Sequence, residues 1–285
     1  LRDLTRYRKS LTDERVREVN RLQKFLEGAN IKLSSVASNV MGVSGRAMLE
    51  ALTAGSTDPQ VLSELAKGRL RKKLPELKKA LEGRFRAHHR FLVAEILTHL
   101  DFLDEAIERV SQEVSNRIAP FSKKVELMDL VPGINQRVAE GVLSEMGVDM
   151  SCFPSHGHAA SWTGLCPGNN ESAGKRKSGK TRKGNQWLRR YLIEASWAAV
   201  RKRGTYLSAL YYRLVPRRGK NKAIVAVAHA LLVMIYHILK HQVSYRELGA
   251  DHFNKLNSAY VQRHHVKRLE SLGFKVILEP LPKAA

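Results

Sequence analysis

The stretch GKRKSGKT at residues 174–181 decides the fold class, because it fits the phosphate-binding loop pattern G-x-x-x-x-G-K-[ST] letter for letter. That loop belongs to α/β proteins, where it follows a buried β-strand and opens directly into a helix. Here the preceding residues are CPGNNESA, which cannot form a buried strand, and Gly184 with Asn185 interrupts any helix start after Thr181. We therefore interpret the segment as a flexible, strongly basic loop and reject a nucleotide-hydrolysing α/β fold.

Charge is the strongest compositional signal in the chain. The 285 residues are 43% hydrophobic, which is enough for two domains with a sizeable core. They include 49 Lys or Arg against 27 Asp or Glu, for a formal net charge of +22. Between Glu171 and Glu247 there are eighteen cations and a single acid, Glu194. Such a balance predicts a polyanionic partner, most simply nucleic acid.

Several other classes of site are excluded or disfavoured. The longest apolar run, residues 223–239, contains two histidines and is interpreted as a buried helix, so no membrane span is expected. Cys152 and Cys166 form neither a zinc pattern nor a disulfide framework and are interpreted as small core residues in a reducing cytoplasm. His237 and His241 have metal-ligand spacing on a helix that also contains His229, but no acidic third ligand is near, so no metal site is predicted.

The hydrophobic pattern predicts a mainly α-helical chain in two parts. Residues 1–27 form an amphipathic helix, residues 31–83 short helices broken by small residues, and residues 76–118 a long heptad-like run that Pro120 ends. We expect residues 1–122 to form an antiparallel coiled-coil arm that serves association, and residues 123–285 to form a second helical domain. FKVILEP at 274–280 is the only credible strand.

The second part opens with a possible phosphate-binding corner. Residues 128–147, MDLVPGINQRVAEGVLSEMG, resemble one hairpin of a helix-hairpin-helix motif, in which a turn directs backbone N–H groups at a DNA phosphate. Asn135 stands where that motif usually has glycine. An ordinary corner between two helices explains the pattern equally well.

The basic loop contains a candidate nucleophile. Ser172, flanked by small residues and cations, is suited to phosphoryl transfer, since Lys and Arg can neutralise a pentacoordinate phosphorane. Composition alone favours a phosphate contact or a turn residue at that position. The candidate nucleic-acid-binding residues are Lys175, Arg176, Lys177, Lys180, Arg182, Lys183, Arg189, Arg190, Arg217, Arg218, Lys220 and Lys222. Asn185 is expected to cap the helix that begins near Gln186.

A resemblance sharpens this interpretation. The segment SWTGLCPGNNESAGKRKSGKTRKGNQWLRRYLIEASWAAV at 161–200 resembles the C-terminal domain of the DEDD-type, bridge-RNA-guided insertion-sequence transposases. Residues 130–147 also match that family's pattern, and residues 44–81 resemble its coiled-coil region. By motif order after Gly164, Leu165 and Pro167, the family's catalytic serine corresponds to Ser172 rather than to Ser178. Ala173 replaces the glycine that is commoner in the family.

The resemblance implies a DNA recombinase that forms a covalent phosphoserine–DNA intermediate. Its partners would be DNA, a structured bridge RNA and further copies of the chain, as a dimer or tetramer joined through the coiled coil. It also implies a location in the bacterial cytoplasm, associated with the nucleoid.

The family's N-terminal RuvC-like domain, whose acids hold Mg²⁺, has no counterpart here, so a magnesium cofactor is expected only with that domain and the chain alone is expected to be inactive. Asp101 and Asp104 mimic an acidic pair but are interpreted as a solvated helix face. The alternative function is a non-catalytic nucleic-acid-binding and dimerisation module.

Overall fold

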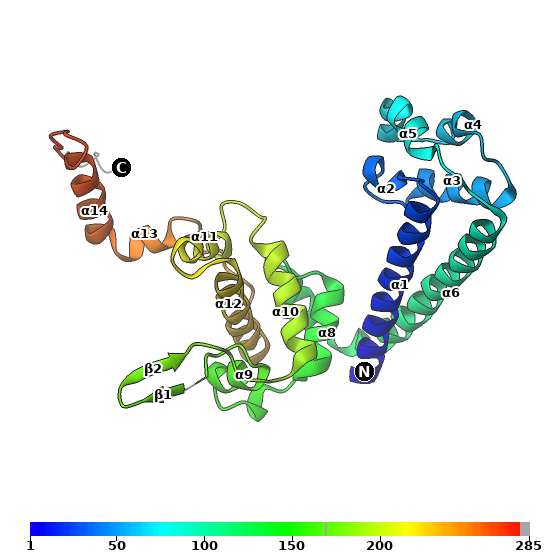
Figure 1. Ribbon diagram of the computed structural model, residues 1–285. Coiled ribbons are helices and arrows are strands. Elements are labelled where there is room, and N and C mark those ends of the chain that lie inside the picture. The colour runs from blue at the N-terminus through cyan, green and yellow to red at the C-terminus, as the bar shows by residue number, and fades with distance from the viewer. Residues whose placement is uncertain (169, 280–285) are drawn as a thin grey trace, which may run out of the picture. The chain divides into compact units, whose positions relative to one another are not determined.

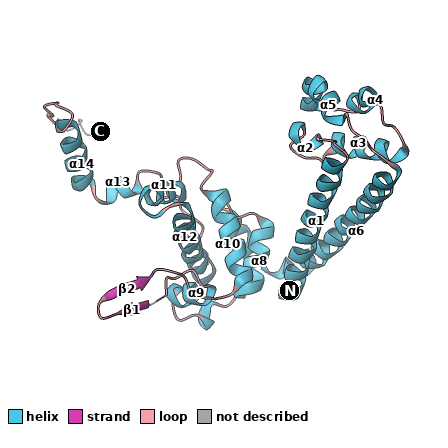
Figure 2. Cartoon of the chain, viewed as in Figure 1, coloured by secondary structure: helices cyan, strands magenta, loops and turns pink. Residues whose placement is uncertain are grey.

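The computed structural model describes residues 1–168 and 170–279, except for the side chain of Arg176. It confirms a mainly α-helical chain (Figures 1 and 2). Contacts divide the chain into two compact units, Leu1–Arg117 and Ile118–Ala285. The first unit contains α1 (Arg2–Gly28), α2 (Leu33–Val36), α3 (Val43–Ala54), α4 (Pro59–Glu64), η1 (Gly68–Lys73), α5 (Leu74–Leu81) and α6 (Ala87–Ile118), which ends at the boundary.

The second unit contains the remaining elements. They are η2 (Ala119–Phe121), α7 (Ser122–Asp129), α8 (Gln136–Met146), η3 (Met150–Cys152), α9 (His156–Thr163), β1 (Asn170–Ser172), β2 (Lys175–Ser178), α10 (Gln186–Ala199), α11 (Tyr206–Arg218), α12 (Lys220–His241), α13 (His252–Leu256) and α14 (Ser258–Glu270). All three tryptophans of the chain lie in this unit.

The long helices α1 and α6 pack against each other in opposite directions. Leu11 of α1 packs with Leu103 and Ile107, late in α6. Leu22, near the other end of α1, shares a buried cluster with Val93, early in α6. Because residues early in one helix meet residues late in the other, the pair is antiparallel.

The predicted heptad run over 76–118 is wrong as a single helix, because the chain breaks between α5 and α6. Gly83 lies in this break, and a Cβ on it would stand 2.5 Å from the carbonyl oxygen of Ala29. The next residue, Arg84, donates its N–H to that same oxygen at 2.8 Å. This close approach to the end of α1 turns the chain, so Leu77 packs in the core beneath α2–α4 instead of extending α6.

The two aspartates on α6 are half-exposed, as a solvated helix face requires, and each pairs with an arginine of another helix. Asp101 accepts from both terminal nitrogens of Arg46 on α3, at 2.8 and 2.7 Å. Asp104 pairs with Arg15 on α1. These pairs connect α6 to its two neighbours and help to set how the helices align.

Helix α12 is the centre of the second unit. It packs against α9, α10 and α11, and Val227, Leu231 and Ile235 are fully buried along it. By length and composition α12 is also the one helix of the described chain that could cross a membrane, and 56% of its most apolar window is buried inside the protein. The expectation of a buried helix is therefore confirmed.

The corner between α7 and α8 packs inward. A Cβ on Gly133, whose φ is +86°, would stand 2.3 Å from the carbonyl oxygen of Ala195 on α10. Asn135 caps α8 by accepting from the backbone N–H of Val138 at 3.0 Å. The glycine thus serves the packing of the corner onto α10, where a side chain would not fit.

The predicted strand at the C-terminus is wrong over the residues that the structure describes. Residues 274–279 have no regular secondary structure, and Pro280 lies outside the described part. Phe274, Ile277 and Leu278 are all exposed. No strand within residues 1–168 and 170–279 pairs with this segment, and a β-rich composition alone does not form a strand.

Candidate active site

The basic loop is an antiparallel β-hairpin, which corrects the prediction of a flexible loop. Strand β1 pairs with β2 so that Ser172 lies opposite Lys175 and Glu171 opposite Arg176. An isolated bridge joins Pro167 to Thr181, and Gly168 donates its N–H to the carbonyl of Lys180 at 2.8 Å. Figure 2 shows the two strands extending from the helical unit.

The tip of the hairpin is a tight two-residue turn. Ala173 has φ +49° and Gly174 has φ +72°, so both central residues are left-handed, as a type I′ turn requires. Glycine adopts this conformation freely, whereas alanine is strained in it by roughly 1–2 kcal/mol. Ser172 is exposed at the first position of this turn.

Directly opposed residues of a hairpin point their side chains to the same face, with Cβ atoms roughly 5 Å apart. The register therefore makes Lys175 the cation placed beside the hydroxyl of Ser172. Ser178, the competing serine, accepts the backbone N–H of Lys180 at 3.1 Å and is half-buried. The two serines thus differ in their surroundings. Ser172 precedes the exposed tip, whereas Ser178 hydrogen-bonds within a turn at the end of β2 that lies away from the tip.

Two glycines build the base of the hairpin. A Cβ on Gly184 would stand 2.4 Å from the backbone nitrogen of Gly164 and 2.5 Å from the carbonyl oxygen of Trp162. Gly164 itself ends α9 in a left-handed conformation, with φ +76°. The backbones at the end of α9 and the start of α10 are therefore in direct contact, and this contact forms the base of the hairpin.

Two polar side chains of α10 fix that base. Arg189, half-buried, donates to the carbonyl of Gly164 and, at 3.0 Å, to the hydroxyl of Thr181. Asn185 accepts from the N–H groups of Trp187 and Leu188, both at 3.0 Å, which confirms it as the helix cap. Its amide also donates to Glu145 at 2.7 Å. These contacts make Arg189 a residue that positions the hairpin from inside the protein.

The other predicted cations are mostly exposed and fall into two groups along the chain. We call the first the hairpin group; it comprises Lys175, Lys177, Lys180, Arg182 and Lys183. The second surrounds the junction of α11 and α12 and comprises Arg217, Arg218, Lys220 and Lys222. Arg190 forms an ion pair with Glu194 at 3.3 Å, and the side chain of Arg176 lies outside the described residues.

The described residues include two free cysteines and no cluster of metal ligands. Burial raises the pKa of the half-buried Cys166 thiol, so it stays protonated at neutral pH. Cys152 is exposed and both cysteines are free thiols, so the interpretation of Cys152 as a core residue is wrong. No group of three His, Cys, Asp or Glu in residues 1–168 and 170–279 is placed to hold a metal ion.

Sequence reasoning missed the residues that support the hairpin. Glu145 on α8 is 1% exposed and is separated from Asn185 by forty residues, so nothing local indicates their contact. The hairpin itself did have a local signal, because a small residue followed by glycine between two polar runs suits a two-residue turn.

Comparison with known proteins identifies this region. The family model described as "Transposase IS116/IS110/IS902 family" matches residues 125–213, which hold the α7–α8 corner, the hairpin and α10. This part of the second unit is therefore a transposase domain. Residues 125–213 are thus similar to the IS116/IS110/IS902 family of insertion-sequence transposases.

Two curated relatives agree with the family match. The chain is 30% identical over 155 residues to "Transposase for insertion sequence element IS1111A" of Coxiella burnetii, covering 53% of this chain and 42% of the relative. It is 27% identical over 181 residues to "Putative transposase y4pF/y4sB" of Sinorhizobium fredii, covering 61% of this chain and 43% of that protein. The chain thus matches less than half the length of either relative.

Proposed function

We propose that this chain recombines DNA as part of a transposase and that the hydroxyl of Ser172 is its nucleophile. The observation that carries the proposal is the place of Ser172, exposed at the tip of a hairpin and opposite Lys175, inside the matched transposase domain. An exposed tip lets a DNA backbone approach the hydroxyl without rearrangement of the core. The cation beside it would stabilise charge that develops on the attacked phosphate.

In the proposed reaction the oxygen of Ser172 attacks a scissile phosphodiester. A bond forms between phosphorus and the serine oxygen, and the bond from phosphorus to the 3′-oxygen breaks. The serine proton passes to water, and the departing 3′-oxygen is protonated in return. Because the phosphoserine ester keeps the energy of the broken bond, attack by another 3′-hydroxyl can rejoin the strands without ATP.

The remaining cations would hold the DNA. The hairpin group follows the proposed nucleophile in sequence and is exposed on β2 and on the segment after it. Arg217, Arg218, Lys220 and Lys222 would contact phosphates farther along the backbone. Arg189 would act indirectly, since its guanidinium holds the carbonyl of Gly164 and keeps the hairpin in place.

The proposal extends to a guide RNA, to assembly and to a place at the bacterial nucleoid. The excess of cations would accommodate a structured RNA as well as DNA. The helical arm leaves large apolar side chains exposed on α1 and α6, which supports pairing with a second copy of the chain. These side chains are Tyr7, Val16, Phe91 and Phe102.

The alternative is a module that binds nucleic acid and associates without chemistry of its own. The observation in its favour is that no group of three His, Cys, Asp or Glu in the described part of the chain is placed to hold a metal ion. In that case Ser172 is a phosphate contact and the nucleophile lies elsewhere. One experiment separates the two functions.

The test is covalent trapping on a suicide DNA substrate, whose nick releases the leaving fragment. It compares the intact transposase with its Ser172→Ala and Ser178→Ala variants. We expect a protein–DNA adduct in the parent and in Ser178→Ala, and none in Ser172→Ala. An adduct that survives in Ser172→Ala, or the absence of adduct in the parent, removes the catalytic proposal and leaves the binding module.

A further inference from the structure

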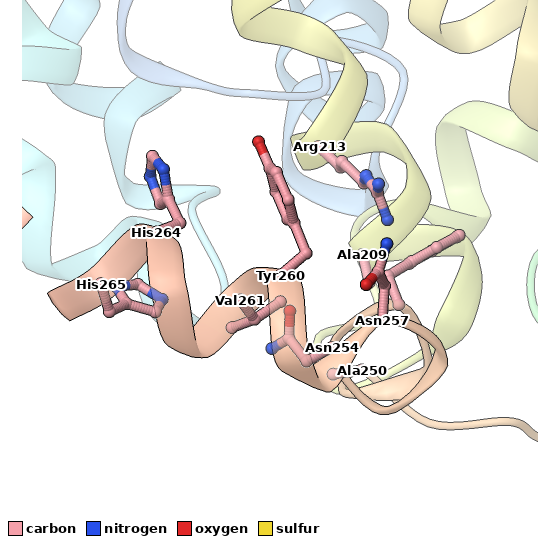
Figure 3. Close-up of a pocket in the computed structure, with 10 residues that line it drawn as sticks. Ala209, Arg213, Ala250, Asn254, Asn257, Tyr260, Val261, His264 and His265 are labelled. Atoms are coloured by element: carbon pink, nitrogen blue, oxygen red, sulfur yellow. The ribbon is translucent and has the colours of Figure 1, made fainter. Parts of the chain in front are cut away.

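A groove lies in the C-terminal part of the second unit, between α11 and the pair α13–α14. Its volume is about 480 Å³, within the range of small-molecule pockets. Of its lining, only Ala209 and Arg213 fall within the matched transposase domain. Figure 3 shows Tyr260 rising from α14, with His264 on one side of it and Arg213, from α11, on the other.

Specific contacts hold the walls of this groove together. Phe253 of α13 stacks on Tyr206, with ring centroids 5.2 Å apart, and the guanidinium of Arg213 lies 4.9 Å from the centre of the Phe253 ring. Glu247 anchors the preceding loop by accepting the N–H groups of Tyr206 at 2.8 Å and Gly249 at 2.9 Å. These contacts join α13 and the loop before it to α11.

The residues that line the groove offer three kinds of interaction that a single nucleotide can make. Tyr260 is 58% exposed, lines the groove and lies nearly parallel to His264, which also lines it, with ring centroids 6.1 Å apart and an interplanar angle of 11°. Asn254 and Asn257 bring amides, which can both donate to and accept from the edge of a base. Arg213 brings a fixed positive charge for a phosphate.

The surroundings favour a polyanion over an acidic or neutral small molecule. Arg217, Arg263 and Lys267 are exposed on the helices that form the groove. Of the two acids nearest in sequence, Asp251 pairs with Lys255 at 2.7 Å and Glu247 is engaged by the backbone contacts described above. A chain that runs past the groove would therefore meet cations on either side of it.

We propose that this groove binds one unpaired nucleotide of a single-stranded nucleic acid, with its base on Tyr260 and its phosphate on Arg213. A base inside a duplex is stacked on both faces and cannot reach the ring, so the groove selects unpaired strand. The inference rests on the proposed function only in assuming that the chain handles nucleic acid. It needs no chemistry at Ser172.

The test compares oligonucleotides that differ only in their bases. Binding of the full chain to a short oligothymidylate is measured against an abasic strand of the same length, with oligouridylate as the RNA arm. Base–aromatic stacking is worth about 1–3 kcal/mol, which predicts at least a roughly fivefold preference for the strand with bases. Tyr260→Ala should abolish this preference, and Tyr260→Phe should keep it.

Tyr212 supplies the matched control. It is 63% exposed on α11 and is not among the groove residues, so Tyr212→Ala should keep the preference. Equal binding of normal and abasic strands by the parent overturns the proposal, as does an unchanged preference in Tyr260→Ala. A change of oligomeric state in Tyr260→Ala would instead assign the groove to a second copy of the chain. Adduct formation at Ser172 is independent of all these outcomes.

Discussion

The two units of the chain use their charges differently. Unit 1 carries 22 Lys or Arg against 16 Asp or Glu, and its acids on α6 join that helix to its neighbours through Arg15 and Arg46. Unit 2 carries 27 against 11, and its hairpin lysines are exposed. Charge in the first unit thus stabilises the fold, whereas most of the excess charge lies in the second unit, where it is available to a polyanion.

A second contrast lies within the hairpin. Its base is set by backbone contacts that leave no room for a side chain, while nothing lies within 4 Å of a Cβ built at the tip glycine, Gly174. Rigid support beneath an open tip is what a residue needs to meet a large substrate in a defined orientation. The predictions below test these two contrasts.

The largest expected effect comes from filling the base. Gly184→Ala places a methyl against the backbones of Trp162 and Gly164, so we expect a loss of about 3 kcal/mol in the free energy of unfolding of the second unit. Gly179→Ala, in the same hairpin but with nothing within 4 Å, is the control and should change it by less than about 1 kcal/mol. Urea unfolding followed by tryptophan fluorescence measures both. Equal losses would refute the tight base.

Removing the cap of α10 should lower the free energy of unfolding somewhat less than Gly184→Ala does. Asn185→Ala deletes the acceptor for two helix N–H groups and the donor to buried Glu145, so we expect a loss of about 2 kcal/mol. Asn135→Ala, which removes a cap of α8 that accepts from one N–H group, should cost about 1 kcal/mol. The same unfolding assay compares them, and an Asn185→Ala loss no greater than that of Asn135→Ala would contradict the role of Glu145.

The contrast in charge predicts different responses to salt. The double variant Lys177→Gln with Lys180→Gln should reduce the slope of log affinity for duplex DNA against log salt by about 2. The matched double variant Arg15→Gln with Arg46→Gln, which removes cations already paired with aspartates, should leave the slope unchanged. Fluorescence anisotropy over a range of salt concentrations measures both slopes. Similar slopes for the two double variants would break the distinction between the units.

The smallest effect is expected at the tip. Ala173→Gly relieves an alanine held at φ +49° and should slow hydrogen exchange in the hairpin by about two- to fivefold, equivalent to about 0.5–1 kcal/mol. Gly174→Ala, at φ +72°, should accelerate it. Faster exchange in Ala173→Gly would contradict the assignment of a type I′ turn.

The helical elements could be predicted from sequence because their apolar periodicity is strong, as in α1 and α12. The hairpin could not be predicted in this way. Its strands have three and four residues, all polar, so they lack the apolar alternation that signals a strand. The heptad run was predicted as one helix because apolar periodicity carries no information about the tertiary contact between Gly83 and the end of α1.

The candidate site likewise contains some residues that can be predicted from sequence and others that cannot. The exposure of cations such as Lys175 and Lys180 can be predicted from the sequence, since basic side chains with few acids nearby stay at the surface. The hydrogen-bond partners of Arg189 cannot be predicted from the sequence, because the carbonyl of Gly164 comes within reach of Arg189 only once α9 and α10 have packed. Sequence therefore indicated what the site contains, and tertiary contacts decide which residues position it.

The most direct test of the account is to map the residue that is joined to DNA. The trapped protein–DNA adduct is digested with nuclease and protease, and the modified peptide is sequenced by mass spectrometry. We predict a single phosphodiester-linked nucleotide remnant on Ser172, in the peptide that spans the hairpin tip. A remnant on Ser178 or on any other residue would contradict the account.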